Sequence, residues 1–164
     1  MNPFEVFDIE EWLASRSTDR QLADGEIVFS HKDGSTSVLI PKEEGEETDG
    51  FLASSPLAWF YERYVGASIG NSHVMLASSR KAGVKISQGF VLPDREKMVA
   101  TLEDLEVVGE ENELLFGVEA AWMFAYGIQD GRLIRHDRDM GESEGVESLE
   151  SVFQDWWNLV CEDE

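Results

Sequence analysis

The sequence predicts an α+β domain in which helices pack on one face and at the ends of a mostly antiparallel sheet. Short strand-like segments are joined by tight turns such as Asp33-Gly34 and Asp130-Gly131, and strands joined in this way pair antiparallel. Segments with helically spaced apolar residues lie at both ends of the chain. The regular alternation of strand and helix that builds a parallel sheet is missing.

The first fifty residues predict a helix followed by a hairpin. Asn2-Pro3 is a helix cap with proline at the first helical position, and helical spacing continues to about Ser15. The β-rich segments 26–30 and 35–40 flank Lys32-Asp33-Gly34, where Asp-Gly supplies the positive-φ pair of a tight turn. Segment 41–50, with four Glu and one Asp, reads as a loop that packs against nothing.

The middle of the chain predicts a second helix and two short strands. Ser54-Ser55-Pro56 caps an aromatic-rich helix over 57–65, which closes at Gly66 in a left-handed C′ position. Segments 73–78 and 84–86 read as strands. The basic residues near their connection indicate a solvated turn: Arg80, Lys81 and Lys85.

The second half predicts a helix from Pro93-Asp94 to about Leu105, a three-strand meander and a final helix. The meander strands are 114–118, 122–128 and 132–136. Ser148 caps the final helix, whose apolar residues recur with helical spacing as far as Val160. A chain of 164 residues is of single-domain size, so we expect one domain over 1–164.

Charge is the strongest compositional signal. The chain has 34 Asp and Glu against 13 Lys and Arg, a net charge of −21, together with five Trp, nine Phe and three Tyr that can build a core. Such a surface repels nucleic acid and anionic membranes and attracts basic proteins, although solubility alone is the other interpretation. Apolar stretches are too short to cross a membrane and the start does not resemble a leader, so we expect a cytoplasmic protein.

No catalytic or metal-binding motif stands out. His31, His73 and His136 are far apart and are interpreted as structural or exposed, even though Asp137 next to His136 is a candidate orienting group. Segment 137–141 begins like a calcium loop, but Gly141 occupies the third ligand position. Segment 66–70 follows a helix and reads as a turn, not as a phosphate loop. We therefore expect no cofactor, no metal and no catalysis.

Most tryptophans lie on apolar stripes and are expected in the core. They are Trp12, Trp59, Trp122 and Trp156. Trp157 is the exception, because its neighbour already faces the stripe and one of the pair is expected to reach the surface.

Two regions resemble the SUKH superfamily. Segment 56–66, in which proline opens an aromatic-rich helix that closes at glycine, is similar to the helix of that family. The later run over 114–139, with Phe153 and Trp157 in the final helix, looks like its C-terminal meander and helix. Val65-Gly66 stands where Asn-Gly often ends the family's first helix, and residues 1 to about 50 look like an N-terminal helix-hairpin addition. The resemblance implies a protein-binding domain, most often a bacterial immunity protein that neutralises a polymorphic toxin, with eukaryotic relatives serving as regulatory scaffolds.

The leading hypothesis is a non-catalytic, immunity-type protein that binds a basic partner, with a nuclease as the favoured toxin. It requires the acids to gather into one patch with aromatic anchors. The proposed residues are Glu43, Glu44, Glu46, Glu47, Asp137, Asp139, Glu142, Glu144 and Trp157. A regulatory scaffold of the same fold is the alternative. A third class is a small-molecule sensor or enzyme with an unrecognised pocket.

Overall fold

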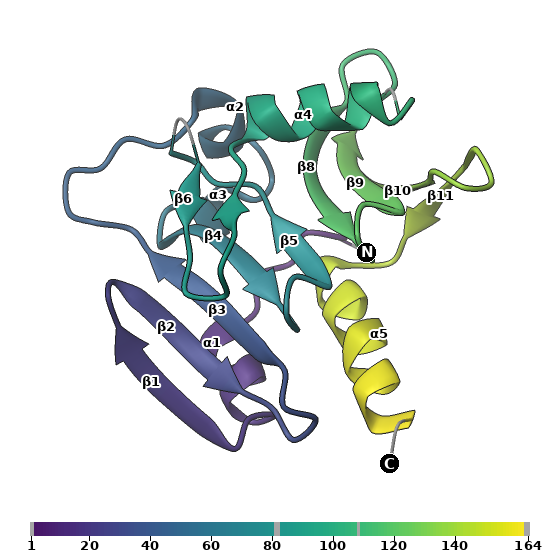
Figure 1. Ribbon diagram of the computed structural model, residues 1–164. Coiled ribbons are helices and arrows are strands. Elements are labelled where there is room, and N and C mark those ends of the chain that lie inside the picture. Colours follow the sequence, from purple (N-terminus) through teal and green to yellow (C-terminus); the bar gives the residue numbers. More distant parts are fainter. Residues whose placement is uncertain (1, 81–82, 108, 163–164) are drawn as a thin grey trace.

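The structure, a computed structural model, describes residues 2–80, 83–107 and 109–162 (Figure 1). Within them one nine-stranded antiparallel sheet has the order β1-β2-β3-β4-β5-β8-β9-β10-β11. Its strands are β1 (Asp19–Ala23), β2 (Glu26–Ser30), β3 (Thr36–Pro41), β4 (Tyr64–Ile69), β5 (Val74–Leu76), β8 (Leu114–Glu119), β9 (Phe124–Gln129), β10 (Arg132–Asp137) and β11 (Glu142–Val146). A separate hairpin pairs β6 (Val84–Lys85) with β7 (Val91–Leu92). The helices are α1 (Ile9–Ala14), α2 (Gly50–Ala53), α3 (Ala58–Tyr61), α4 (Arg95–Asp104) and α5 (Leu149–Glu162).

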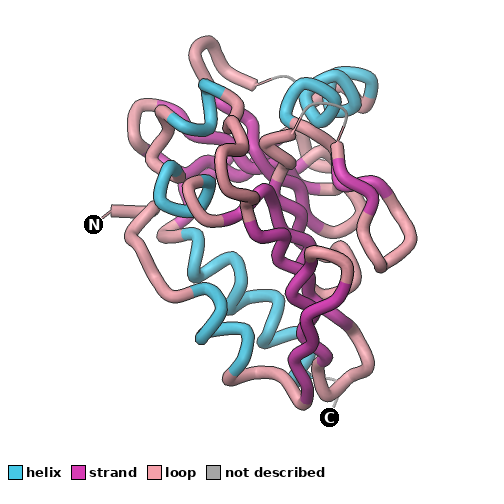
Figure 2. The backbone as a smooth tube through the Cα atoms, turned by 90° about the vertical axis from the view of Figure 1, so that its left-hand side faces the viewer, coloured by secondary structure: helices cyan, strands magenta, loops and turns pink. Residues whose placement is uncertain are grey.

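The predicted fold class is confirmed, but the helices cover both faces of the sheet instead of one. Leu39 and Leu76 point into the cluster formed with α1 and α5, whereas their neighbours Val38 and Met75 point into the cluster formed with α4. This alternation is the period-two pattern of a strand buried on both sides. Figure 2 shows helices on either side of the strands.

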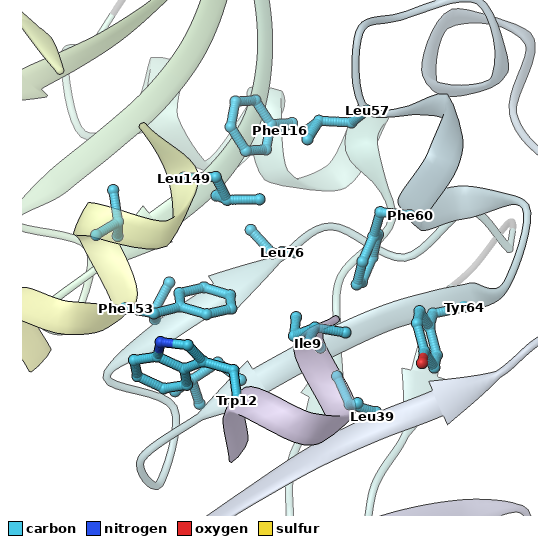
Figure 3. Packing of buried hydrophobic residues seen from close by; sticks show 14 of the residues in the cluster. Ile9, Trp12, Leu39, Leu57, Phe60, Tyr64, Leu76, Phe116, Leu149 and Phe153 are labelled. Carbon is cyan, nitrogen blue, oxygen red and sulfur yellow. The ribbon is translucent and has the colours of Figure 1, made fainter. Parts of the chain in front are cut away.

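The larger core lies between the sheet and helices α1 and α5 (Figure 3). Phe153 of α5 packs beside Trp12 of α1, with ring centroids 5.8 Å apart. Burial of such a side chain stabilises the fold by roughly 1.5–3 kcal/mol. The predicted α5 is confirmed, including its start, because Ser151 N donates to Ser148 Oγ at 3.0 Å.

The first helix starts later than predicted. Asn2 accepts a hydrogen bond from Phe4 N at 3.0 Å in a turn that buries Phe4, and the helix begins only at Ile9. Asp8 is its N-cap and accepts from Glu11 N at 3.1 Å. The segment expected as an addition supplies α1 to the main core and β1 to β3 to the common sheet.

The predicted β2–β3 hairpin is confirmed, with a different turn. Gly34 has a φ of 88°, whereas Asp33 is not among the positive-φ residues and its carboxylate accepts from Ser35 N at 3.0 Å. Strand β1 was not predicted. Its five residues are all exposed, so it lacks the alternation by which a strand is recognised.

The predicted helix over 57–65 is wrong in its second half. α3 ends at Tyr61 and β4 begins at Tyr64, so Gly66 lies in a strand and not at a helix C′ position. All six residues of β4 are buried, and an apolar run buried on both faces has no period that separates strand from helix. Leu92 approaches Gly66 closely, since a Cβ there would lie 2.6 Å from Leu92 Cδ2. For the same reason 66–70 is mostly strand and not a turn.

The second half follows the prediction closely. Strands β5, β6, β8, β9 and β10 are present, and α4 begins after Asp94, which accepts from Lys97 N at 3.3 Å. The meander continues into a fourth strand, β11, that the sequence did not indicate because four of its five residues are exposed.

Candidate functional site

The eight acids proposed as one surface lie in two separate groups. One group occupies the loop between β3 and α2, and the other lies on β10, on β11 and in the turn between them. Four strands separate β3 from β10, so five spacings of about 4.8 Å put the groups about 24 Å apart. Figure 1 shows the loop and the hairpin on opposite sides. These residues therefore do not form one continuous patch.

The acidic loop is anchored, contrary to the prediction that it packs against nothing. Arg80 Nη2 donates to Glu46 Oε1 at 2.7 Å, and this hydrogen bond, more than the opposing burial, lowers the pKa of Glu46. Arg80 is thus an ion-pair partner and not part of a solvated turn; Lys81 lies outside the described residues. Glu43, Glu44 and Glu47 of the same loop are exposed.

The second acidic group mainly shapes the β10–β11 turn. Asp137 Oδ1 accepts from Asp139 N at 3.0 Å and from Met140 N at 3.1 Å. Glu142 and Glu144 are exposed, and Glu144 Oε1 lies 3.6 Å from Arg135 Nη1. This is a capped turn beside a sheet edge, far from the other acids.

Trp157 is only partly buried, but its ring already has contacts. It lies 5.8 Å from the ring of Trp156 and 6.1 Å from that of His31, and Lys32 Nζ sits 5.2 Å from its centroid. The ring packs against the main core. These contacts support a packing role and not the exposed anchor expected from the sequence.

His31 has hydrogen-bonding partners and the ring of His73 lies beside a carboxylate, as their structural interpretation predicted. His31 Nδ1 lies 2.9 Å from Arg16 O, and Nε2 lies 2.7 Å from Ser37 Oγ. His73 Nε2 lies 3.3 Å from the buried carboxylate of Glu119. Burial raises the pKa of Glu119, but the nearby His73, the hydrogen bond from Tyr126 and the charge of Arg135 outweigh it, and the net pKa lies below the usual value. Among the described residues, no three His, Cys, Asp or Glu side chains are grouped to hold a metal ion.

The free energy of unfolding should depend on pH through His31. Burial lowers the pKa of His31 in the folded state, against weaker opposing effects of Arg16 O and Asp33. The unfolded chain therefore takes up this proton first, and stability present above about pH 6.5 is lost as the pH falls through the folded pKa. We expect the stability advantage of the wild type over His31→Gln to shrink from about pH 7.5 to about pH 5 in urea titrations. Parallel pH profiles of the two proteins would contradict this.

His136 joins an exposed serine to a buried carboxylate by hydrogen bonds, and these partners are residues other than Asp137. Its Nδ1 lies 2.7 Å from Ser143 Oγ and its Nε2 lies 2.5 Å from Glu113 Oε2. Serine, histidine and carboxylate in this order also occur in hydrolytic sites. Here the hollows at Ser143 measure only about 290 and 240 Å³, and Glu142 and Glu144 flank the serine with negative charge that opposes its ionisation. The arrangement therefore fits a structural role, in which His136 satisfies the buried Glu113.

A large concave surface lies at the N-terminal end of α4, on the face of the sheet opposite α5. It has two neighbouring hollows that share Asp94 and Glu96, and we call them together the α4 groove. Its apolar half, about 950 Å³, lies between the β6–β7 hairpin, α4 and two turns of the sheet. The apolar residues that line it are Met75, Phe90, Val91, Pro93, Ala121 and Trp122. Val91 is 54% exposed.

Polar contacts fix the hairpin that forms one wall of the α4 groove. Ser87 N and Oγ donate to the buried carboxylate of Glu26, with Ser87 Oγ at 2.7 Å from Oε1. Gln88 Nε2 donates to Thr36 O at 2.8 Å, and Ser68 Oγ donates to Gln88 Oε1 at 2.6 Å. The tip of the hairpin is thereby attached to β2, β3 and β4, and Phe90 and Val91 are held over the sheet.

Two left-handed turns form the opposite wall. Residues 70–72 have φ values of 62°, 56° and 69°, and residues 120–122 have 54°, 56° and 69°. The turns are adjacent, since Ala120 N donates to His73 O at 2.8 Å. Five of these six residues are not glycine, and each such conformation costs about 1–2 kcal/mol, so the surrounding structure has to enforce it. The result places Ser72, Ala121 and Trp122 on the groove wall.

The polar half of the α4 groove measures about 650 Å³ and is negative. Five carboxylates line it against two guanidinium groups, a net charge of −3. Arg95 Nε lies 3.3 Å from Asp49 Oδ2, and its guanidinium stacks 4.4 Å from the ring centroid of Phe51, which is 65% exposed. Of the sequence-predicted residues, Glu46 and Glu47 line this half.

No protein-family model matches the chain, and neither curated proteins nor solved structures gave a significant match. The likeness to the SUKH superfamily thus rests on the sequence segments alone. Among the described residues no helix has both the length and the apolar character that crossing a membrane requires.

Proposed function

We propose that this chain is a non-catalytic binding domain that docks a basic protein on the α4 groove. Within that role it acts as an immunity-type protein that neutralises a toxin, with a nuclease as the favoured class. The observation that carries the proposal is the groove itself: an apolar half beside a half of charge −3, on a chain of net charge −21.

The two halves contribute differently to binding. Partner side chains that enter the apolar half bury apolar surface, and anchors in such pockets carry much of the affinity of an interface. The negative half and the rest of the acidic surface accelerate encounter with a cationic protein, an effect that salt weakens. A nuclease presents a basic groove for phosphates, and carboxylates at those positions would exclude its substrate.

Only some of the residues that were proposed from the sequence lie beside the α4 groove. Glu43, Glu44 and Glu47 belong to the loop that borders the α4 groove. The acids of the β10–β11 hairpin lie elsewhere and act only through the overall field, and Trp157 packs against the main core.

A charge placed in the apolar half should abolish much of the binding. We expect Val91→Glu to weaken inhibition of the toxin encoded by the adjacent gene by about tenfold or more, because a carboxylate would be desolvated in the interface. Leu22→Glu is the matched control, since Leu22 is also an exposed strand residue, 71% exposed, on β1 outside the groove. The measurement is the inhibition constant of both variants at low and high salt. Equal potency of the two variants would refute the assignment of the groove.

The volume of the apolar half also favours a small-molecule sensor as a second candidate function, because ligand sites usually measure about 300–1,000 Å³. Defined metabolites that raise the unfolding temperature of the wild type but not of Val91→Glu would support this candidate. A regulatory scaffold remains the alternative for the protein-binding role. Reconstitution with purified host complexes and with the toxin, side by side, separates the two.

A further inference from the structure

We infer that the apolar half of the α4 groove holds one α-helix of the protein partner, an amphipathic helix with basic residues beside its apolar stripe. The inference deepens the proposed function, and it rests on that function only in assigning the helix to a basic protein. The helical form of the occupant follows from the length of the groove, from its cross-section and from the backbone groups that line it.

The apolar half of the groove runs alongside α4. Asp94, Lys97 and Thr101 line it, and they share one face of the helix because they are three and four residues apart. The seven steps from Asp94 to Thr101 rise about 10 Å along the helix axis. An occupant that lies along this wall therefore spans about two helical turns, with apolar side chains at positions i, i+3 or i+4, and i+7.

The cross-section of the apolar half matches that of a helix. This half measures about 950 Å³, and over a length of about 10 Å it has a mean cross-section of about 90–95 Å². A cylinder of that section is about 11 Å wide, and an α-helix with its side chains measures about 10–12 Å. A single extended strand fills only about 48 Å², given about 4.8 Å between neighbouring strands and about 10 Å between stacked sheets. One helix therefore fills this half, whereas one strand leaves about half of it empty.

The described lining gives an extended segment little to pair with. Met75, on the floor, belongs to β5, which is paired with β4 on one side and with β8 on the other. The hairpin wall contributes β7, a strand of only two residues that runs into Pro93, and proline has no N–H. A strand or loop pressed into this groove would bury unpaired backbone groups, whereas a helix satisfies its own. The backbone groups of the lining therefore also favour a helix.

Charge decides which protein supplies the helix. The carboxylates of Asp94 and Glu96 and the ammonium of Lys97 give the lining of the apolar half a net charge of −1, and the adjoining polar half has −3. A second copy of this chain, also with a net charge of −21, is repelled. A helix with Lys or Arg beside its apolar stripe is attracted, and its basic residues fit best at the end next to Asp94 and Glu96.

The test uses two capped peptides of about 14 residues with the same leucine and lysine composition. In one peptide the leucines recur with helical spacing, and in the other they alternate with period two. We expect the helical peptide to bind at least about tenfold more tightly in fluorescence anisotropy, to become helical in circular dichroism and to shift the indole N–H signal of Trp122 in NMR. Equal or tighter binding of the period-two peptide, or binding of neither, would overturn the helical occupant.

Two pairs of variants place the peptide in the groove. Val91→Glu should weaken binding of the helical peptide by about tenfold, whereas Leu22→Glu on β1 should leave it within about twofold. Thr101→Lys puts a cation on the α4 wall and should weaken binding by about fivefold or more. Ala100→Lys is its control, because Ala100 is exposed on α4 outside the lining of the groove. Equal losses within either pair would reduce the effect to overall charge and overturn the placement.

The inference and the proposed function fail in different ways. If Val91→Glu loses inhibition of the toxin but the wild type binds the period-two peptide as tightly as the helical one, the groove function stands and the helical occupant is overturned. If the helical peptide binds as expected but no basic protein is inhibited, the helix site stands and the proposed function fails.

Discussion

We expect Gly70→Ala to lose about 2–5 kcal/mol of unfolding free energy, one of the largest single-residue effects in this fold. Gly70 begins the left-handed turn between β4 and β5, with a φ of 62°. A Cβ at this position would fall on the indole of Trp156, 2.5 Å from Cε2. Trp156 is itself buried between α5 and the sheet, so neither group can move away without loss of packing.

Gly131→Ala is the matched control for that variant. Gly131 has a φ of 74° in the β9–β10 turn, but a Cβ there would meet no atom within 4 Å. We therefore expect Gly131→Ala to lower the free energy of unfolding by only about 1–2 kcal/mol, the cost of placing alanine in the left-handed backbone conformation. Urea unfolding of both variants measures the difference, which isolates the contact with Trp156. Equal losses in the two variants would show that Trp156 does not press against this turn.

Elements whose signal is local were predictable from the sequence. α5 carries its own cap and a one-sided apolar stripe, and β2 and β3 are joined by a turn whose chemistry is visible in five residues. The 57–65 helix failed because its second half is buried on both faces, where the packing of Gly66 against Leu92 decides the conformation. Propensity is a weak guide where tertiary contacts compete with it.

Edge strands escaped prediction for the opposite reason. β1 is exposed along its whole length, and β11 in four of its five residues, so neither shows an apolar alternation. Charged residues on these edges, such as Arg20 and Glu144, also discourage pairing with other chains. Their existence follows from the neighbouring strands, which provide unpaired backbone groups, and not from their own sequence.

The α4 groove could not have been predicted from the spacing of residues along the sequence. It joins the loop around Phe51, the hairpin at Val91 and the turn at Trp122, which are distant in the chain. The left-handed turn over 120–122 consists of Ala, Ala and Trp, residue types that disfavour positive φ and so give no turn signal. The abundance of acidic residues in the sequence led to Glu46 and Glu47, which line the groove, but also to acids on the β10–β11 hairpin near the other edge of the sheet. Net charge carries no information on the position of the residues that carry it.

We expect replacement of His136, the sequence neighbour of Asp137, to have the second large effect on the free energy of unfolding. Asp137 is adjacent in the strand and therefore points to the other face, whereas His136 reaches Glu113, whose side chain has no exposed surface. His136→Leu leaves this carboxylate buried without its partner, and we expect a loss of about 3–5 kcal/mol in the free energy of unfolding. Circular dichroism in a urea series measures it.

The double variant His136→Leu/Glu113→Met should recover most of that loss, because methionine keeps the unbranched shape of glutamate while the buried charge disappears. Ser143→Ala removes only the outer partner of the chain, 2.7 Å from His136 Nδ1, and should cost about 1 kcal/mol. If the double variant were as unstable as the sum of its single changes, the pair would not be coupled. Coupling of the pair together with a small effect of Ser143→Ala would instead show that the buried His136–Glu113 contact contributes most of the stability. This contact links strand β10 to the segment that enters β8, and the exposed serine would then be dispensable.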